Sequence, residues 1–519
     1  MIEAWKESIL GGGLLALYYL ILGVLAFYGI HRLWLVWVYL RAERRGQGPP
    51  VPAPLPEDPS AWPRVTVQLP LYNEMYVVRR LIDAVAKLDY PAGRLEIQVL
   101  DDSTDSTSDI VAERVEHHRA RGVDIHHLRR ADRTGYKAGA LAAGLRAARG
   151  ELIAVFDADF VPRPDFLRRA VPHLAADEGL GMVQARWSHL NREFSLLTRL
   201  QAIFLDGHFL IEHTARHRGG CFFNFNGTAG IWRREAIEEA GGWQHDTVTE
   251  DLDLSYRSQL AGWRFLYLPE LDVPSELPVD INGFKSQQRR WARGSVQTGR
   301  KLLGTILTSR LPARVKLEAF VHLTNNLSYV LMVLLSLLIL PAMILRRGSS
   351  AAVLLAVDLP LFLAATVSVL VFYAASQSAP GGAGRRELRY LPAVMGLGIG
   401  LALANAPAVV SGLFAKGGVF HRTPKYAIGG PDAHAGKNRD ETWHAKLYRS
   451  ALGPTVILEG LFALYFAGSL IYAAAVGMWM SLPFLYLFFQ GYTYMFLLSL
   501  LPAMARRVAA RKGALAQEV

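Results

Sequence analysis

The sequence predicts an α/β protein whose doubly wound, mostly parallel sheet is inserted between transmembrane helices. Three observations predict this architecture. Short apolar strand patterns alternate with helical stretches within a polar block, residues 41–318. Long apolar segments lie on both sides of that block. Acidic residues directly follow two of the strands, and the carboxyl ends of strands are where such sheets bind ligands.

Composition separates the polar block from its apolar flanks. Of the 519 residues, 51% are hydrophobic and only 19% are charged, with a mean hydropathy of +0.18. A helix that spans a bilayer needs about 20 mostly apolar residues. We therefore expect a multi-pass protein of a lipid bilayer, with candidate spans near residues 9–30, 320–345, 351–375, 391–413, 454–476 and 479–503.

The ends of the apolar segments indicate orientation. The N-terminal segment is expected to be a retained anchor, because its start is not clearly basic and no small-x-small cleavage site follows its long apolar core. Basic residues follow three spans, at 41–45, 385–389 and 506–512, and such loops face the cytoplasm. The net charge of +11 is therefore explained by the orientation of the chain in the membrane. Nucleic-acid binding is the other explanation, but the basic residues form no continuous stripe that would bind a nucleic acid.

The single cysteine, Cys221, excludes an intramolecular disulfide and a cysteine-built metal site, and we expect a packed thiol.

Composition and charge divide the chain into six parts. The parts are an N-terminal transmembrane anchor (1–40), a proline-rich linker (41–63), the α/β domain (64–280), amphipathic interfacial helices (281–318), a transmembrane bundle with a loop at 414–430 (319–505) and a basic cytoplasmic tail (506–519).

Within the α/β domain, period and turn residues predict alternating strands and helices. Helices are expected at 76–88, 106–121 and 137–148, and strands at 65–69, 95–100, 124–128 and 152–156. Asp101-Asp102 ends the second strand, and Asp157-Ala158-Asp159 ends the fourth. Both acidic pairs should therefore lie at the edge of the sheet where ligands bind.

Asp157-Ala158-Asp159 is the first candidate site. Two carboxylates on one short loop suit Mg²⁺ or Mn²⁺, which bind one or two carboxylates plus phosphate oxygens. Such a metal would neutralise a departing diphosphate. An Asx-turn or a helix cap also explains this loop, because aspartate is frequent in both.

Two other acidic sites have structural alternatives as well. Asp101-Asp102 can accept hydrogen bonds from a ribose or a base, whereas residues just after it can cap the next helix. Thr249-Glu250-Asp251 precedes a helical stretch, where the helix dipole favours acids in any protein. A carboxylate in that place is also the kind of group that removes a proton from a sugar hydroxyl.

A basic and aromatic cluster follows, just ahead of the second apolar region. Gln287, Arg290 and Trp291 lie within about one helical turn. Arginine offers a fork of N–H groups for phosphate, and an indole can stack on a sugar ring. An amphipathic interfacial helix, anchored by Trp and Arg, explains the same residues, and both interpretations can hold together.

In this order, the motifs resemble the family 2 inverting glycosyltransferases. They are most similar to the membrane-embedded branch of cellulose synthase, hyaluronan synthase and the plant mannan-synthase-like proteins, closely over 62–300 and more loosely over 320–430. Phe225-Asn226-Gly227-Thr228-Ala229-Gly230, with Gly241-Gly242-Trp243, looks most like the mannan-synthase-like proteins. Phe160 stands where cellulose synthases favour histidine, and Ser103-Thr104 where many relatives have a glycine, which argues against cellulose as the product.

The resemblance implies a GT-A fold and a role for each motif. Asp251 would be the catalytic base, and Asp157 and Asp159 would bind Mg²⁺ or Mn²⁺. The other residues would contact the nucleotide sugar (Tyr72, Glu74, Asp101, Asp102, Lys137, Asp157, Arg290), contact the acceptor (Asn226, Glu250, Gln287, Trp291), or close over the nucleotide sugar as part of a gating loop (Phe420, Thr423, Lys425).

We therefore expect a hexosyltransferase of the cell (inner) membrane with a cytoplasmic catalytic domain. It would move a sugar from a UDP- or GDP-linked nucleotide sugar to a growing β-linked polysaccharide. Transfer in a single step to a lipid acceptor is the alternative. A membrane scaffold with an inactive sugar-binding domain is a third interpretation, and the intact Asp159, Asp251 and Arg290 argue against it.

Topology imposes one more expectation. If all six apolar segments crossed the bilayer, the loop after 413 would lie on the side opposite the catalytic domain, and a gating loop there could not reach the nucleotide sugar. We therefore expect either 351–375 or 391–413 to be interfacial or re-entrant.

Overall fold

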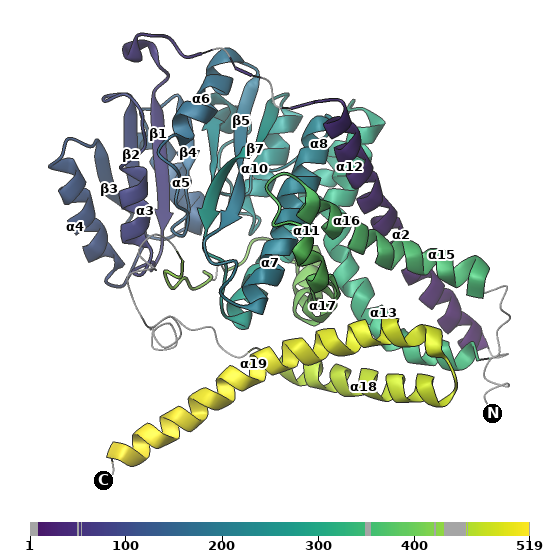
Figure 1. The fold of residues 1–519 in the computed structure, drawn as a ribbon. Helices are drawn as coiled ribbons and strands as arrows, with labels where there is room; N and C mark the ends of the chain where they lie inside the picture. Colours follow the sequence, from purple (N-terminus) through teal and green to yellow (C-terminus); the bar gives the residue numbers. More distant parts are fainter. Residues whose placement is uncertain are drawn as a thin grey trace.

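The computed structural model describes residues 9–48, 51–52, 54–347, 354–419, 422–429, 453 and 455–517, with side chains up to Leu501. An α/β domain lies at one end of the molecule, and long helices extend from it (Figure 1). The domain is built on a seven-stranded sheet, in the order β3-β2-β1-β4-β6-β5-β7, formed by the described residues. The strands are β1 Val65–Leu71, β2 Leu95–Asp101, β3 Ile125–Arg129, β4 Leu152–Val155, β5 Leu180–His189, β6 Gly230–Arg233 and β7 Arg264–Ser275.

The sheet confirms the predicted fold class. Strands β1 to β4 are parallel to one another, and β5 is parallel to β7, while β6 is antiparallel to both β4 and β5. All four strands expected from the sequence are present, within two residues at each end. Because β1, β2 and β4 are parallel, the loops after them meet at one edge of the sheet.

Helices cover both faces of this sheet. On α3, Val78, Leu81, Ile82 and Val85 recur with helical period and are fully buried against one face. Leu141 of α5 and Leu254 of α10 belong to a second core on the other face. The helices of the domain are α3 Val78–Val85, α4 Thr107–Arg119, α5 Tyr136–Ala147, α6 Phe166–Ala176, α7 Leu196–Asp206, η2 Gly207–His213, α8 Thr214–Arg218, α9 Arg234–Glu239, α10 Glu250–Leu260 and α11 Ile281–Thr308.

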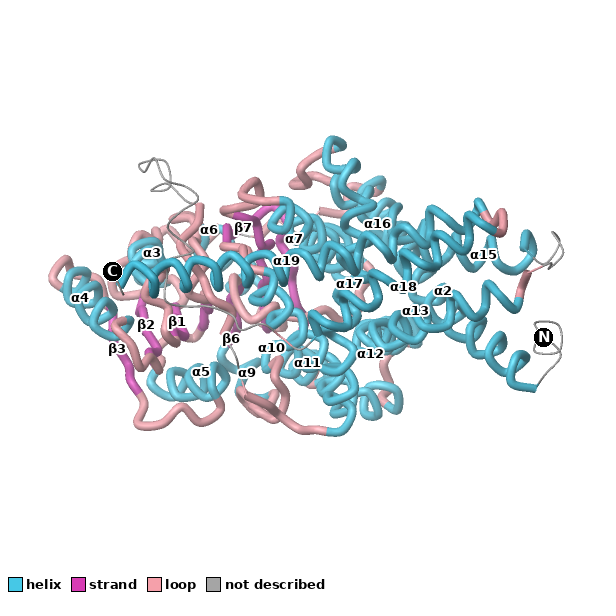
Figure 2. The backbone as a smooth tube through the Cα atoms, turned by 90° about the horizontal axis from the view of Figure 1, so that it is seen from below, coloured by secondary structure: helices cyan, strands magenta, loops and turns pink. Residues whose placement is uncertain are grey.

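The apolar segments form a separate set of helices. Among the described residues, six helices are long and apolar enough to cross a membrane, at Ile9–Arg44, Ala313–Leu345, Leu355–Ser378, Arg385–Phe414, Thr455–Ala475 and Trp479–Leu501. They comprise α2 Ile9–Arg44, α12 Ala313–Thr324, α13 Ser328–Leu345, η4 Leu354–Asp358, α15 Leu359–Phe362, η5 Leu363–Val367, α16 Ser368–Ser378, α17 Leu391–Phe414, α18 Thr455–Ala475 and α19 Leu482–Gln517. Figure 2 shows α2, α13 and α15 extending away from the strands.

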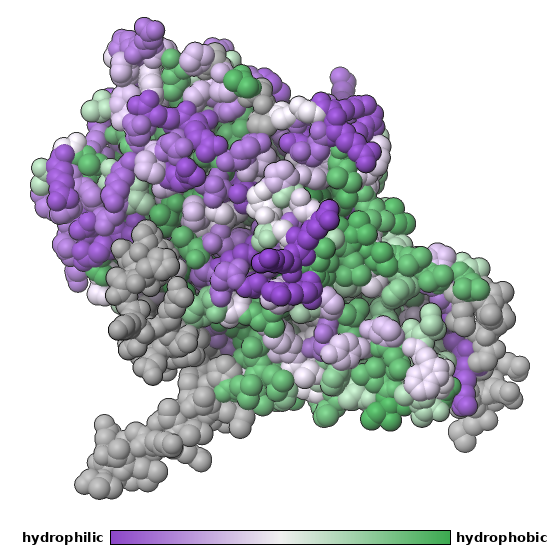
Figure 3. Space-filling view, in the orientation of Figure 1, coloured by the Kyte–Doolittle hydropathy of each residue, from purple (hydrophilic) through white to green (hydrophobic). Residues whose placement is uncertain are grey.

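The surface follows the same division. Polar residues gather over the sheet domain, and apolar residues gather over the helices that extend from it (Figure 3). Large apolar side chains such as Ile457, Leu464 and Ile471 of α18 are 71% exposed. In water such a surface would be costly, because each Å² of exposed apolar area costs about 25 cal/mol. The helices therefore have the surface of a membrane region.

Helix α17 differs from the other apolar helices. In its apolar stretch, 67% of the residues are buried, against 17–33% for the other five. Just before it, Arg199 of α7 donates to Glu387 at 3.0 Å, and just after it, Gln297 of α11 donates to the Gly417 carbonyl at 2.8 Å. The segments that flank α17 therefore contact the α/β domain, and the helix itself packs against α11, α13 and α19.

Candidate functional site

The predicted catalytic residue, Asp251, lies where α5, α10 and the loop before β6 meet. Lys137 in the first turn of α5 donates to Asp157 Oδ1 at 2.5 Å and to the Gly227 carbonyl at 2.8 Å. Gly227 has a φ of +81°, and a Cβ there would lie 2.9 Å from Asp251 Oδ2. Only glycine fits this turn, because any side chain would press on the carboxylate.

Asp157 comes from the end of β4, and its backbone N–H donates to Thr228 Oγ1 at 2.9 Å. The carboxylates of Asp157, Asp159, Glu250 and Asp251 all act electrostatically on Arg290. Burial lowers the pKa of the Arg290 guanidinium, and these four carboxylates oppose that effect. The structure thus brings together acidic residues from the loop after β4 and from the first turn of α10 around Lys137 and Arg290.

The surroundings of Asp251 prepare its carboxyl group to take up a proton. Burial is the largest cause that raises its pKa, to about 7, and the neighbouring Glu250 raises it further. Lys137 and the N–H of Leu252, which donates to Asp251 Oδ1 at 2.8 Å, act in the opposite direction. Burial also raises the pKa of Glu250. A carboxylate with a pKa near neutrality is suited to general-base catalysis.

Helix α11 carries Gln287, Arg290 and Trp291 to the acidic cluster. Its close approach depends on Gly294, because a Cβ at that position would overlap the side chain of Thr249, the residue before Glu250. Asp280 begins the helix by accepting from the Gly283 N–H at 2.9 Å. The indole of Trp291 lies 6.5 Å from that of Trp187 on β5, measured between ring centroids.

A glycine pair on α11 tests this packing. Gly294→Ala is expected to push α11 away from Thr249 and to lower the activity of the site about tenfold or more, since displacements near 1 Å are costly in active sites. Gly304→Ala on the same helix meets nothing within 4 Å and should keep full activity and gain about 1 kcal/mol of helix stability. Steady-state rates and thermal unfolding of both variants check this. Equal activities would contradict it.

The predicted nucleotide-contacting residues divide into two groups. Asp102 pairs with Arg130, whose Nε lies 3.0 Å from Asp102 Oδ1, and the Arg133 guanidinium lies 3.3 Å from the Tyr72 ring centroid. Asp101 is fully buried instead and accepts from Ser108 and the Ser103 N–H. Burial favours its neutral form, but these hydrogen bonds and one to His127 lower its pKa to about 2.

Asp101 therefore serves the fold, because its carboxylate binds neighbouring strand and helix residues. Asp102, Tyr72 and the two arginines beside them stand at the strand end. Asp101 is the last residue of β2, whereas Asp102 is the first residue of the loop that follows it. From the sequence, Asp101 and Asp102 were both predicted to contact the nucleotide. The hydrogen-bond partners of the two carboxylates distinguish them.

The segment predicted to form a gating loop is described over residues 422–429, whereas Phe420 lies outside the described residues. Arg422 pairs with Glu74 at 2.9 Å, and Lys425 pairs with Asp159 and donates to the Glu276 carbonyl at 2.8 Å. Thr423 is buried. Burial raises the pKa of Glu74 to about 8, although Arg422 opposes it. The segment therefore contacts Glu74 and Asp159, two of the predicted site residues.

The carboxylates of Asp157 and Asp159 fit a divalent cation whose coordination shell is completed by a bound ligand. No group of three or more His, Cys, Asp or Glu side chains is placed to hold a metal within the described part of the chain. Asp157 and Asp159 supply two carboxylates, and each now binds a lysine ammonium. Mg²⁺ and Mn²⁺ need no more than such a pair when phosphate oxygens and water complete the shell. The metal stays a prediction.

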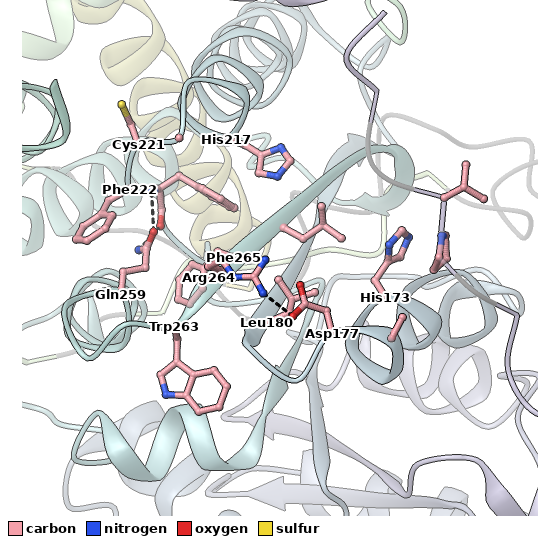
Figure 4. A pocket seen from close by; sticks show the side chains of 16 residues that line it. His173, Asp177, Leu180, His217, Cys221, Phe222, Gln259, Trp263, Arg264 and Phe265 are labelled. Carbon is pink, nitrogen blue, oxygen red and sulfur yellow. Dashed lines mark hydrogen bonds and ion pairs between the residues drawn. The ribbon is translucent and has the colours of Figure 1, made fainter. Parts of the chain in front are cut away.

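A cavity on another side of the domain contains none of the predicted site residues. It is lined by residues that include His173, His217, Cys221 and Gln259, and Figure 4 shows Arg264 bound to Asp177 at its edge. Cys221 is buried, as expected, and burial raises the pKa of its thiol to about 11. The acidic cluster is therefore separate from this cavity.

Comparisons with known proteins bear on the α/β domain. Residues 63–294 match the model described as glycosyltransferase like family 2. The chain carries a family 2 glycosyltransferase domain. The match covers all the acidic motifs and the Gln287–Trp291 cluster, so the resemblance noted from the motifs is confirmed.

Curated relatives of the glycosyltransferase domain share one kind of name. Glucomannan 4-beta-mannosyltransferase 1 of Oryza sativa subsp. japonica is 42% identical over 291 residues, which are 55% of each chain. Glucomannan 4-beta-mannosyltransferase 2 of Arabidopsis thaliana is 46% identical over 255 residues, 48% of each chain. The chain therefore spans about half the length of the curated relatives that it matches.

A solved structure is also similar. The mannosyltransferase PcManGT from Pyrobaculum calidifontis, in complex with GDP-Man and Mn²⁺, is 25% identical and superposes with a TM-score of 0.47, covering 69% of this chain and 97% of that one.

Proposed function

We propose that this protein is an inverting hexosyltransferase that adds mannosyl residues from a nucleotide sugar to a growing β-linked polysaccharide. The observation that supports it most is Asp251, a carboxyl group with a pKa raised to about 7, which lies beside Lys137, Asp157 and Arg290 at the ligand-binding edge of the sheet. The names of the curated relatives support mannose as the sugar.

The proposed reaction is a single displacement. Asp251 accepts the proton of an acceptor hydroxyl as that oxygen forms a bond to the anomeric carbon. The bond from the anomeric carbon to the diphosphate oxygen breaks, and the leaving nucleoside diphosphate keeps the electron pair. Arg290 stabilises the charge on the leaving group, and Lys137 holds Asp157 beside it. A divalent cation at Asp157 and Asp159 would neutralise diphosphate oxygens.

A screen of nucleotide sugars tests the proposed substrate. Membranes that contain the protein are incubated with labelled GDP-mannose, UDP-glucose or UDP-N-acetylglucosamine, and the product is separated by size and digested with a β-mannanase. We expect a mannanase-sensitive polymer from GDP-mannose. A labelled glycolipid as the end product would support the single-step alternative, and transfer from none of the three would contradict the proposal.

We further propose that α17 lies at the membrane interface, so that the catalytic domain and the 422–429 segment share the cytoplasmic side. Support comes from the contacts at both ends of α17 and from Gln377, at the end of α16, which donates to Asp206 of the domain at 3.1 Å. Five crossings, by α2, α12–α13, η4–α16, α18 and α19, then leave the basic C-terminal tail in the cytoplasm.

Cysteine labelling tests this topology. Ser378→Cys and Lys416→Cys flank α17, and Met480→Cys lies between α18 and α19, all at exposed positions in a Cys221→Ser background. A membrane-impermeant maleimide should label Cys at 480 in intact cells, and label Cys at 378 and 416 only in inverted vesicles. Labelling of 378 and 416 on opposite sides would show that α17 crosses the bilayer.

A further inference from the structure

A histidine and a glutamate on η2, just after α7, lie beside the predicted acceptor residue Asn226. Asn226 Nδ2 lies 2.9 Å from His208 Nε2, and His208 Nδ1 lies 3.0 Å from Glu212 Oε2. The π-helical winding of η2 presents both side chains on one side, and such segments are frequent at functional sites. Hydrogen bonds thus link the loop of Gly227 to η2.

The same segment borders the indole that is predicted to hold the acceptor. The ring of Phe209, the neighbour of His208, lies 5.1 Å from Trp187, and Trp187 lies 6.5 Å from Trp291. Asn226 precedes Gly227, where an added Cβ would lie 2.9 Å from Asp251 Oδ2. His208 therefore contacts both Asn226, the neighbour of Gly227, and Phe209, which packs on Trp187.

Two polar atoms in this region have no partner among the described residues. Asn226 Oδ1 and Trp187 Nε1 are inaccessible to solvent and form no hydrogen bond. An unsatisfied buried polar atom costs about 1–3 kcal/mol, and an ordered water or a ligand is a partner that removes this cost. Asn226 Oδ1 is a hydrogen-bond acceptor and Trp187 Nε1 is a donor.

A chain of ion pairs connects η2 to α12 and α2. Glu212 accepts from Arg216 at 3.4 Å, Arg216 donates to Glu318 of α12 at 2.8 Å, and His31 of α2 lies 2.7 Å from Glu318. Arg216 and Glu318 are almost fully buried. The chain fixes Glu212, and through it His208, relative to two membrane-region helices.

We propose that His208 and Glu212, together with Asn226, form a subsite that binds hydroxyls of the acceptor glycan next to Trp291. His208 is in direct contact with the sugar, while Glu212 positions the imidazole. This inference rests on the proposed function, because it supplies the acceptor side of that reaction. A polar row beside an aromatic ring is how proteins bind sugars, with the ring against the sugar face and the polar groups at its edge.

Binding of β-1,4-mannotetraose to the purified full-length protein tests the subsite without catalysis. The quenching or shift of tryptophan fluorescence is followed during titration with the oligosaccharide. His208→Ala should raise Kd about tenfold, the size expected for one lost hydrogen bond in a charged network. His208→Gln, whose amide reaches toward the Nε2 position, should recover part of the loss. His117→Ala, at a partly exposed histidine of α4, is the control and should leave Kd unchanged.

The readouts separate a failure of the subsite from a failure of the proposed function. Binding of GDP-mannose, measured by thermal shift, should be the same in His208→Ala and wild type, because His208 faces the acceptor side. A Kd for mannotetraose within twofold of wild type in His208→Ala, or an equal loss of GDP-mannose binding, would overturn the subsite. If wild-type protein binds mannotetraose but transfers no sugar, the proposed function fails while the subsite stands.

Discussion

Asp251→Asn is expected to lower kcat for sugar transfer by about a hundredfold or more, with nucleotide-sugar binding retained. Asparagine keeps the size of the side chain but cannot accept the hydroxyl proton, and general-base catalysis contributes about 10²–10⁴-fold. Transfer rates and thermal shifts with nucleoside diphosphate measure the two effects.

A matched control lies in the loop just before α10. Asp246→Asn changes a half-exposed aspartate that pairs with Lys301, so kcat should stay within about twofold, as for most surface changes. If Asp251→Asn retained near wild-type transfer, Asp251 could not be the base.

Arg290→Lys carries the second large effect. Lysine keeps the positive charge but loses the fork of N–H groups that suits a diphosphate, so we expect kcat to fall about 10²–10³-fold. Arg290 lies among four carboxylates, and the loss should be greater for Arg290→Ala.

The neighbouring arginine provides the control. Arg289 donates to the Lys285 carbonyl at 3.4 Å on its own helix, so Arg289→Lys should stay within about threefold of wild-type kcat. Comparable losses in Arg289→Lys and Arg290→Lys would indicate that the helix as a whole, and not one guanidinium, supports transfer. Rates over a range of nucleotide-sugar concentrations separate KM from kcat.

Local sequence patterns predicted the strands that carry the acidic loops. Apolar β-branched runs ending in aspartate located the ends of β2 and β4, because these signals depend only on neighbouring residues. The order of the motifs predicted the family. The antiparallel placement of β6 could not be predicted in this way, since it depends on which strands the chain between β4 and β7 brings together.

Contacts between segments that are distant in the sequence could not be predicted from local sequence patterns. Lys425 meets Asp159 although 266 residues separate them, and Gly294 matters only because Thr249 lies against it. We expected either 351–375 or 391–413 to be interfacial or re-entrant in the membrane. The sequence does not distinguish the two segments, because both are apolar. The hydrogen bonds at the ends of α17 supply the basis for choosing the second.

The pH dependence of kcat/KM, compared between wild type and Glu250→Gln, tests the central claim most directly. Asp251 must be ionised to accept a proton, so transfer should fall as pH decreases through about 7, the pKa to which burial and Glu250 raise it. Glu250→Gln removes a negative charge beside Asp251, lowers its pKa and should shift the acid limb to lower pH. An acid limb that is absent from wild type, or that stays in place in Glu250→Gln, would contradict the assignment of Asp251 as the catalytic base.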